Sequence, residues 1–387
     1  MIPRMLSKKL ILLARKFPVI ALTGPRQSGK TMLAKSLFAN KPYISFEDLD
    51  TRESAASDPR GFLGRFPKGA IFDEAQRVPQ LFSYIQTIVD EKQTPGMFIL
   101  TGSQQFLLLE NLSQTLAGRV SLQTLLPFSL EEMETTPFAL KSIEEALFKG
   151  MYPRIYDKRI DPRDWYPGYI RTYLERDVRF VRNVNDLNTF QKFLKLCAAR
   201  TGQLLNLSSL ANDCGVTHNT AKGWISILEA GYIIYLLQPH HSNFNKRLVK
   251  APKLYFYDTG LVCSLLGIEN RKQLETHPLR GFLFETWVMA ELVKARTNMG
   301  FLPNLFFWRD KTGHEIDCVI ERGNTLIPVE IKSGKTVTSD FFKNLEYWQR
   351  ISSAKKRKAF LVYGGETAQK RKSVTVLGWK DLKIISS

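Results

Sequence analysis

Residues 24–31 hold the stretch Gly24-Pro25-Arg26-Gln27-Ser28-Gly29-Lys30-Thr31, a complete G-x-x-x-x-G-K-[ST] pattern. The apolar run Val19-Ile20-Ala21-Leu22-Thr23 precedes it, and a helix-forming run from Thr31 to Leu37 follows. A strand, a glycine loop and a helix in this order are the context in which the pattern holds nucleotide phosphates. Backbone N–H groups of the loop and of the helix N-terminus face those phosphates. We therefore predict that all eight residues bind ATP, with Lys30 on the β- and γ-phosphates and Thr31 on Mg²⁺.

A second apolar run, Gly69-Ala70-Ile71-Phe72-Asp73-Glu74, has the length of a buried strand and ends in two acids. A P-loop ATPase needs a carboxylate at this place for the magnesium shell, and Asp73 fits that role. Glu74 beside it would polarise the attacking water. The alternative interpretation is an ordinary pair of acids at the end of a strand.

A third apolar run, Met97 to Thr101, is followed by Gly102 and Ser103. Ser103 is the candidate polar residue that senses the γ-phosphate. Arg119 is a candidate for stabilising charge in the transition state, either in its own subunit or in a neighbouring one; the alternative is a structural salt bridge. Alternating strands and helices predict an α/β ATPase domain over residues 1–135, with a parallel sheet and helices on both faces.

The middle of the chain divides into two predicted parts. Residues 136–200 have a helical pattern rich in arginine and are expected to form a linker region. Residues 201–245 read as a helix broken at Gly215, a second helix from His218 to Leu228 and a strand over 231–237. This order predicts a winged helix-turn-helix. The start of its second helix is where recognition helices contact DNA, although such modules also pack against proteins.

Residues 246–387 are predicted to form a third α/β domain with a second acidic site. Glu285 is a carboxylate on an otherwise apolar helical stripe, which is costly unless the acid is paired or binds a metal. A strand hairpin would bring Asp317 close to Glu330, and Glu330 and Lys332 share one strand face. Two carboxylates can bind Mg²⁺, and the lysine can orient or deprotonate a water that attacks a phosphodiester.

This arrangement resembles the PD-(D/E)XK nuclease superfamily. The Gln-x-x-x-Tyr helix element of some subfamilies is not matched after Lys332, where Asn344 and Tyr347 stand instead. Cleavage is therefore one interpretation, with Glu285, Asp317, Glu330 and Lys332 as catalytic residues and Asp317 and Glu330 as metal ligands. The other interpretation is a retained nuclease-like fold that is used for binding DNA or for packing, without cleavage.

The chain also resembles a bacterial and archaeal group of AAA+ superfamily ATPases in which a P-loop module is fused to a C-terminal domain of unknown function. The resemblance spans nearly the whole chain and implies ATP hydrolysis with magnesium. The stretches that carry it are GPRQSGKT, AIFDEAQ, LTGSQQ and LAGRV in the first part, and GFLFETWVMAEL, EIDCVIE and PVEIKSG in the last hundred residues.

The net charge of +18 is unevenly distributed along the 387 residues. Residues 1–135 contain 16 Lys and Arg against 13 Asp and Glu, and the remainder contains 39 against 24. A basic C-terminal part is the electrostatic footprint expected for a polyanion partner. The four cysteines have no zinc-ligand spacing, and no stretch approaches a membrane span. We expect a cytoplasmic protein without a membrane partner.

Two hypotheses of function follow. The first is an ATP-driven motor or remodeller that acts on duplex or branched DNA. The second is a switch-type signalling ATPase whose C-terminal domains bind proteins without cleaving DNA. A small-molecule kinase fits poorly, because a winged helix and a nuclease-like domain would have no role in it. Sites of this type are often completed at subunit interfaces, so we expect an ATP-dependent homo-oligomer, with a hexameric ring as one arrangement.

Overall fold

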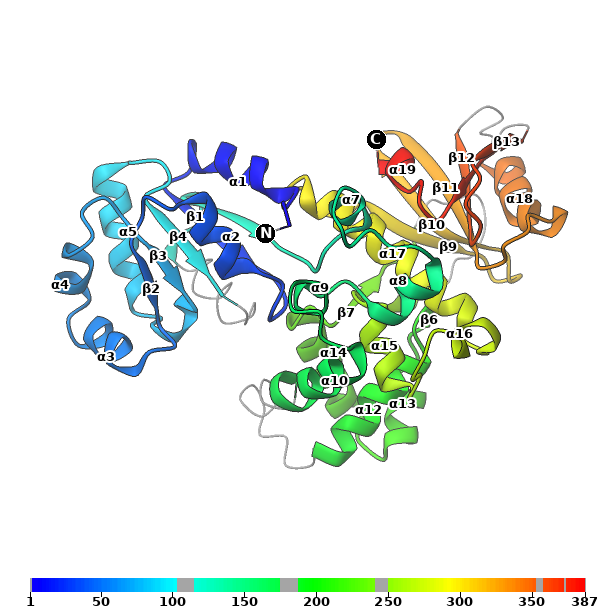
Figure 1. The fold of residues 1–387 in the computed structure, drawn as a ribbon, viewed down its shortest axis with the longest axis horizontal. Coiled ribbons are helices and arrows are strands. Elements are labelled where there is room, and N and C mark those ends of the chain that lie inside the picture. The colour runs from blue at the N-terminus through cyan, green and yellow to red at the C-terminus, as the bar shows by residue number, and fades with distance from the viewer. Residues whose placement is uncertain are drawn as a thin grey trace. The chain divides into compact units, whose positions relative to one another are not determined.

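The computed structural model describes residues 2–102, 115–174, 187–240, 250–352, 358–371 and 374–386. The chain divides into two compact units (Figure 1). Ser103 lies outside the described residues, so its contact with the γ-phosphate stays a prediction. The first unit comprises Met1–Phe128, Ala230–Tyr232 and Thr297–Phe301, and the second comprises Ser129–Glu229, Ile233–Arg296 and Leu302–Ser387.

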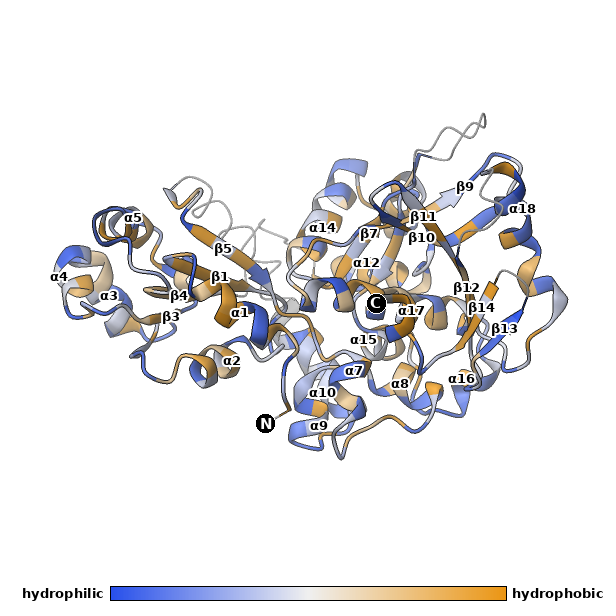
Figure 2. Cartoon of the chain, turned by 90° about the horizontal axis from the view of Figure 1, so that it is seen from above, coloured by the Kyte–Doolittle hydropathy of each residue, from blue (hydrophilic) through white to orange (hydrophobic). Residues whose placement is uncertain are grey.

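The first unit is built on a five-stranded sheet in the order β2-β3-β4-β1-β5. Every pairing in it is parallel, as the sequence predicted. All five residues of β1 are buried, which is typical of a parallel strand covered on both faces, and Figure 2 shows this strand as hydrophobic. The strands are β1 Val19–Thr23, β2 Tyr43–Ser45, β3 Ile71–Asp73, β4 Phe98–Thr101 and β5 Val120–Thr124.

Two hydrophobic clusters pack on this sheet, and alternate residues of β1 enter different ones. Val19 and Ala21 belong to a cluster with stacked phenylalanines, in which the rings of Phe72 and Phe98 lie 5.7 Å apart. Ile20 and Leu22 belong to the other cluster. This period of two places helices on both faces of the sheet. The helices are α1 Leu6–Ala14, α2 Lys30–Leu37, α3 Leu49–Ser57, α4 Pro59–Gly64, the 3₁₀ turn η1 Ala75–Arg77 and α5 Leu81–Lys92.

The second unit begins with a helical region, as predicted for residues 136–200. Aromatic side chains pack its interior: the ring of Tyr152 lies 4.8 Å from Trp165 and 5.1 Å from Tyr169. These tyrosines are therefore core residues of the helical region. The helices are α7 Leu130–Glu134, α8 Ile143–Lys149, α9 Pro153–Asp157, α10 Pro162–Tyr169, the π turn η2 Ile170–Leu174 and α12 Leu187–Ala199.

A helix–turn–helix and a small sheet follow. Helix α13 (Leu207–Cys214) ends at Gly215, whose φ of 75° allows the turn into α14 (His218–Ala230). A three-stranded antiparallel sheet comes next, in the order β6-β8-β7. Because β8 pairs with both other strands, the domain boundary expected at residue 245 does not fit, and this sheet extends beyond it. Its strands are β6 Gln203–Leu204, β7 Ile234–Leu237 and β8 Lys253–Phe256.

The rest of the second unit contains a six-stranded sheet in the order β13-β14-β12-β11-β10-β9. The predicted hairpin is confirmed, because β10 and β11 pair antiparallel. Helix α18 buries Leu345 and Trp348 in a cluster with Trp308. The elements are α15 Thr259–Leu265, α16 Gln273–Thr276, α17 Arg280–Asn298, β9 Leu305–Arg309, β10 Glu315–Arg322, β11 Thr325–Lys332, η3 Ser339–Phe342, α18 Lys343–Ile351, β12 Ala359–Tyr363, β13 Gln369–Arg371, β14 Val374–Gly378 and α19 Lys383–Ser386.

All four cysteines are buried and carry free thiols. Among the described helices, none combines the length and the apolar character needed to cross a membrane.

Candidate functional site

The glycine loop lies between the end of β1 and the start of α2. Gly24 has a φ of 135°, and a Cβ added to it would lie 2.1 Å from the carbonyl oxygen of Leu125. Gly29 caps α2 with a φ of 96°, again in the left-handed region that favours glycine. Both glycines are thus required by the backbone, and the loop leads directly into the N-terminus of α2.

Lys30 and Thr31, the first residues of α2, contact the loop and the neighbouring strand. The Lys30 ammonium donates to the carbonyl oxygens of Gly24 at 2.9 Å and Pro25 at 2.8 Å. The Thr31 hydroxyl donates to the Asp73 carboxylate at 3.0 and 3.2 Å. The two residues predicted as magnesium ligands are therefore neighbours, although they are 42 positions apart in the chain.

Two further side chains hold Asp73, and the sequence did not single them out. Tyr43 of β2 donates its hydroxyl to Asp73 Oδ2 at 2.8 Å, and Thr101 of β4 donates to Oδ1. Burial, together with the hydrogen bond to Asp73 and its charge, raises the pKa of Tyr43 to about 12. Because β3 lies between β2 and β4, both neighbours can fix the orientation of the carboxylate.

Glu74 follows β3 with a left-handed backbone, at a φ of 55°. Gln76 donates from Nε2 to Glu74 Oε2 at 2.5 Å. The Gln76 side chain is buried, and its own Oε1 has no hydrogen-bond partner. The Gln76 amide thus contacts the predicted water-activating carboxylate and can orient it. The DEAQ stretch contains both residues, but only the geometry of the turn brings the side chains at positions 74 and 76 into contact.

Arg119 lies at the opposite end of the strands from the glycine loop, because it precedes β5, which pairs parallel with β1. The N–H of Val19, at the start of β1, donates to the Arg119 carbonyl at 3.3 Å, whereas the loop begins where β1 ends. A five-residue strand rises by about 16 Å. The Arg119 guanidinium instead forms two hydrogen bonds to Asp90 of α5, at 2.5 and 2.8 Å. One strand length therefore separates Arg119 from the loop of its own subunit, and its role in hydrolysis stays a prediction.

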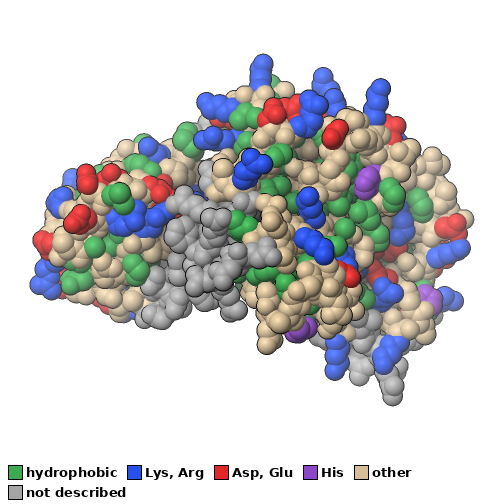
Figure 3. Space-filling model, turned by 90° about the horizontal axis from the view of Figure 1, so that it is seen from below, with side chains coloured by type: hydrophobic (Ala, Val, Ile, Leu, Met, Phe, Trp, Pro, Cys, Tyr) green, Lys and Arg blue, Asp and Glu red, His purple; other side chains and the backbone are tan. Residues whose placement is uncertain are grey.

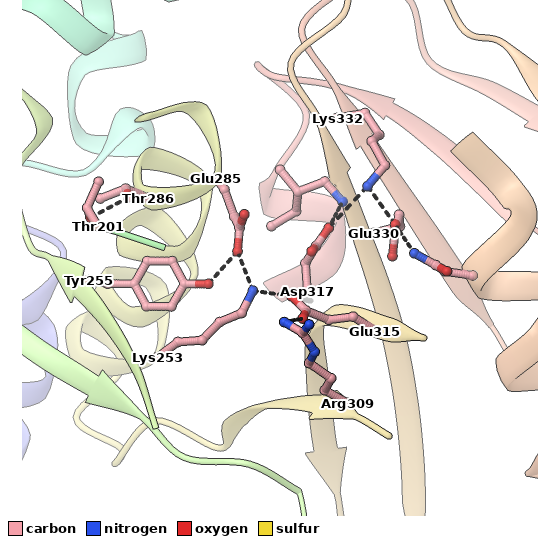
Figure 4. Close-up of polar contacts among 12 residues, drawn as sticks. Thr201, Lys253, Tyr255, Glu285, Thr286, Arg309, Glu315, Asp317, Glu330 and Lys332 are labelled. Atoms are coloured by element: carbon pink, nitrogen blue, oxygen red, sulfur yellow. Dashed lines mark hydrogen bonds and ion pairs between the residues drawn. The ribbon is translucent and has the colours of Figure 1, made fainter. Parts of the chain in front are cut away.

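The second site brings Asp317, Glu330 and Lys332 together. Cys318 pairs with Val329, so the register places Asp317 of β10 opposite Glu330 of β11. The Lys332 ammonium lies 2.6 Å from Glu330 Oε1 and 3.7 Å from Asp317 Oδ2 (Figure 4). Asp317 also accepts the backbone N–H of Ile331 at 2.7 Å.

Glu330 is the most deeply buried of these acids, at 1% exposure. Its Oε1 accepts from Asn344 of α18 at 3.0 Å, while its buried Oε2 has no hydrogen-bond partner. Burial raises the pKa of Glu330 to about 8, and the charge of Asp317 adds to the rise against the opposing effect of Lys332.

Glu285 of α17 lies at the same site but is paired with a strand of the smaller sheet. Its Oε1 accepts from Lys253 at 3.0 Å and from Tyr255, both on β8. Lys253 also forms an ion pair with Glu315 of β10 (Figure 4). Burial raises the pKa of Glu285 to about 7, and the charge of Asp317 adds to this rise, while Lys253 opposes it. No pattern in the chain singles out Lys253, which lies 32 positions from Glu285.

The predicted cluster of Asp317, Glu330 and Lys332 is present, and metal binding at Asp317 and Glu330 stays a prediction. No three His, Cys, Asp or Glu side chains in the described ranges form a group that could hold a metal ion. Lysines contact these acids, with Lys332 on Asp317 and Glu330 and Lys253 on Glu285. The ATP site needs fewer ligands, because Mg²⁺ in such sites takes one or two protein oxygens plus phosphates and water. Thr31 and Asp73 meet that requirement.

Comparison with known proteins agrees with the fold of the first unit. A family model described as an AAA domain matches residues 16–134. Models for two domains of unknown function, DUF8612 and DUF4143, match residues 140–272 and 280–382. With its parallel sheet and glycine loop, the chain is an ATPase of the AAA+ P-loop class.

Two curated relatives are the uncharacterized proteins Rv2008c of Mycobacterium tuberculosis and Mb2031c of Mycobacterium bovis. Each is 31% identical over 323 residues, which cover 82% of this chain and 71% of the relative. The chain belongs to the family of these proteins, in which the activity of the C-terminal part is unassigned.

Solved structures with some likeness include a Walker-type ATPase, paby2304, of Pyrococcus abyssi. It has 16% identity and a TM-score of 0.46, and the match covers 67% of this chain and 94% of that one. AMPPCP-bound DnaA of Aquifex aeolicus has 16% identity and a TM-score of 0.30, over 58% and 85% of the two chains. RuvB of Thermotoga maritima has 17% identity and a TM-score of 0.29, over 59% and 88%.

Proposed function

We propose that this chain is a Mg²⁺-dependent ATPase that acts on DNA through its second unit and does not cleave it. ATP binds the glycine loop, and the Lys30 ammonium exchanges its bonds to the loop carbonyls for bonds to the phosphates. Thr31 and Asp73 hold Mg²⁺, which neutralises phosphate charge when bound. Glu74 orients the attacking water. Tyr43, Thr101 and Gln76 keep these two carboxylates in place.

The proposal that the second unit acts on DNA rests on one observation. Asp317, Glu330 and Lys332 lie in contact on adjacent strands. The elements around them run α17, β9, β10, β11, α18 and β12, an order that resembles the nuclease superfamily suggested by the sequence. The α13–α14 pair and the small sheet support a winged helix beside it. The basic excess after residue 135 adds an electrostatic attraction for phosphate backbones.

Binding without cleavage fits the charges at the second site. The buried Lys253 and the half-buried Lys332 already pair with the acids, and removing either partner of a buried pair leaves an uncompensated charge. Figure 3 shows Lys and Arg side chains interspersed with Asp and Glu across the coloured part of the visible face. On that face, DNA contacts would come from separate basic side chains and not from one continuous patch.

Homo-oligomerisation is part of the proposal. Because Arg119 lies far from the loop of its own subunit, it can only reach ATP bound by a neighbour. Its bonds to Asp90, on a partly exposed surface, keep the guanidinium near the protein surface until a second subunit docks.

A second candidate function is a switch-type signalling ATPase whose second unit binds a protein. The observation that favours it is the internal neutralisation of the acidic cluster, which a purely structural module would also require.

ATP hydrolysis by the full chain with single-stranded, duplex and branched DNA separates the two candidates. We expect DNA to stimulate hydrolysis, and DNA binding to weaken steeply with added salt because counterions are released on binding. Hydrolysis that is unchanged by every DNA, with no DNA binding at low salt, would leave the signalling ATPase as the better interpretation.

A further inference from the structure

Helix α18 and the turn between β9 and β10 form a pocket of about 670 Å³. Four of its lining side chains carry the inference: His314 from the turn, and Lys343, Tyr347 and Arg350 from α18. The pocket belongs entirely to the second unit, and the ATPase chemistry does not use it.

The pocket has a planar aromatic platform. The rings of His314 and Tyr347 stack with centroids 3.7 Å apart and an angle of 6° between their planes. The His314 side chain remains 41% exposed. A stacked imidazole with an accessible side is suited to receive another planar ring, since every nucleobase has a π-face.

Buried Asp310 holds this platform rigid. Its carboxylate accepts the Tyr347 hydroxyl at 2.9 Å and the His314 backbone N–H at 3.1 Å. The Thr312 hydroxyl bonds both Asp310 at 2.7 Å and His314 Nδ1 at 3.0 Å. Both rings are therefore oriented before any ligand binds, which lowers the entropy cost of binding.

The lining also includes two cations, Lys343 and Arg350. The Arg350 guanidinium lies 5.7 Å from the Tyr347 ring centroid, and the Lys343 side chain is 74% exposed beside Asp340. Glu346 is the one acid among the residues that line the pocket. Cations beside an aromatic platform match a ligand that alternates phosphates with planar rings.

The pocket adjoins the carboxylate–lysine site. Asn344, which lines the pocket, donates to Glu330 Oε1 at 3.0 Å. A strand lying along α18 would thus pass from the platform towards Lys332.

We propose that this pocket binds single-stranded nucleic acid, with an unpaired base stacked on His314 and the backbone phosphates held by Lys343 and Arg350. The inference rests on the proposed function, in which the second unit binds DNA. It adds which surface of the unit binds and that the bound nucleic acid is single-stranded. Bases paired in a duplex stack on one another and are not free to stack on an imidazole.

The test measures binding of the full chain to labelled oligothymidylate and to an abasic oligonucleotide of the same length, which keeps the phosphates but lacks the bases. His314→Ala should weaken binding to oligothymidylate about tenfold, the scale of one lost base stack, and leave the abasic strand nearly unaffected. His314→Phe keeps a flat ring and should retain most of the affinity. Arg350→Ala should weaken binding to both strands.

Lys272→Ala is the matched control, because it removes one exposed positive charge from the same unit away from the pocket. It should change neither affinity by more than about twofold, as expected for a distant surface charge. Unchanged ATP hydrolysis and unfolding temperature of His314→Ala would show that the variant is folded.

The outcomes separate this inference from the function on which it rests. Equal binding of the abasic strand and oligothymidylate, or wild-type affinity in His314→Ala, overturns the base-stacking pocket while DNA binding by the chain stands. A preference for duplex DNA that is unaffected by Arg350→Ala overturns it as well. Absence of binding to every DNA overturns the proposed function and this inference together.

Discussion

Gln76 donates a hydrogen bond of 2.5 Å from Nε2 to Oε2 of Glu74, the carboxylate that follows strand β3. Glu74 is itself the left-handed residue of the turn, with a φ of 55°, and the bond joins it to Gln76 two positions later. A non-glycine residue in this conformation is uncommon, and such strain often marks a functional site. Gln76 is thus a positioning residue for the group that orients water.

Gln76→Ala should lower kcat for ATP hydrolysis about tenfold and leave KM nearly unchanged, because general-base catalysis depends on the orientation of Glu74. Steady-state kinetics of the variant measure both constants. Glu74→Gln should retain ATP binding and hydrolyse more slowly still, since it removes the base itself. Gln80→Ala, an exposed change nearby, is the control. Wild-type kcat in Gln76→Ala would mean that the hydrogen bond has no catalytic role.

Lys30→Ala should reduce hydrolysis roughly a hundredfold or more, the scale for losing one preorganised charge-stabilising group. The fold should persist, because Lys30 contacts loop carbonyls and supports no apolar core. A phosphate-release assay and thermal unfolding measure the two effects. Lys16→Ala, an exposed lysine on the same unit, should behave as wild type. Loss of cooperative unfolding in Lys30→Ala would show a structural role instead.

Mixing Arg119→Ala subunits with Lys30→Ala subunits should restore part of the activity that each variant lacks alone. Arg119 lies at the strand ends opposite to its own loop, so some mixed interfaces would combine an intact Lys30 with an intact Arg119 from a neighbour. Hydrolysis measured against the mixing ratio tests this. If a well-mixed oligomer shows no rescue at any ratio, Arg119 serves only its salt bridge with Asp90.

Stability should fall as pH rises from about 5 to about 8, because Glu330 binds its proton more tightly in the folded chain than in the unfolded one. In that window the folded state holds more protons, so raising the pH favours unfolding; Glu285, with a pKa of about 7, acts in the same direction. Glu330→Gln should flatten this slope in denaturant unfolding. The exposed Glu321→Gln, on the same sheet, should not. An unchanged slope in Glu330→Gln would contradict the burial argument.

The wild-type chain should cleave neither duplex nor branched DNA in Mg²⁺ or Mn²⁺, because Lys332 and Lys253 already neutralise the acids. Gel analysis of labelled DNA measures cleavage, and Asp317→Ala should leave ATP hydrolysis intact. Metal-dependent cleavage that disappears in Asp317→Ala would show that a nuclease site assembles after all.

Much of the fold followed from local patterns in the chain. The run Val19–Thr23 before the glycine loop predicted β1, the loop and α2, and the parallel α/β sheet is confirmed. The hairpin that brings Asp317 to Glu330 was also predictable, because side chains alternate along a strand and the spacing sets the pairing. These features depend on residues close in sequence or on a single turn.

The sequence by itself therefore determined the ATPase class, the loop that binds phosphate, and the pairing of Glu330 with Lys332. Only the tertiary structure decided which distant side chains complete each site. Strand order places Tyr43 and Thr101 on either side of Asp73. The parallel strands place Arg119 at the strand ends away from the glycine loop. Packing of β8 beside α17 brings Lys253 to Glu285, so this acid on the apolar helical stripe is paired, which is one of the two alternatives that its predicted burial left open. Contacts between elements that are far apart in the chain produce no periodic pattern in the sequence, because they depend on how whole strands and helices pack together.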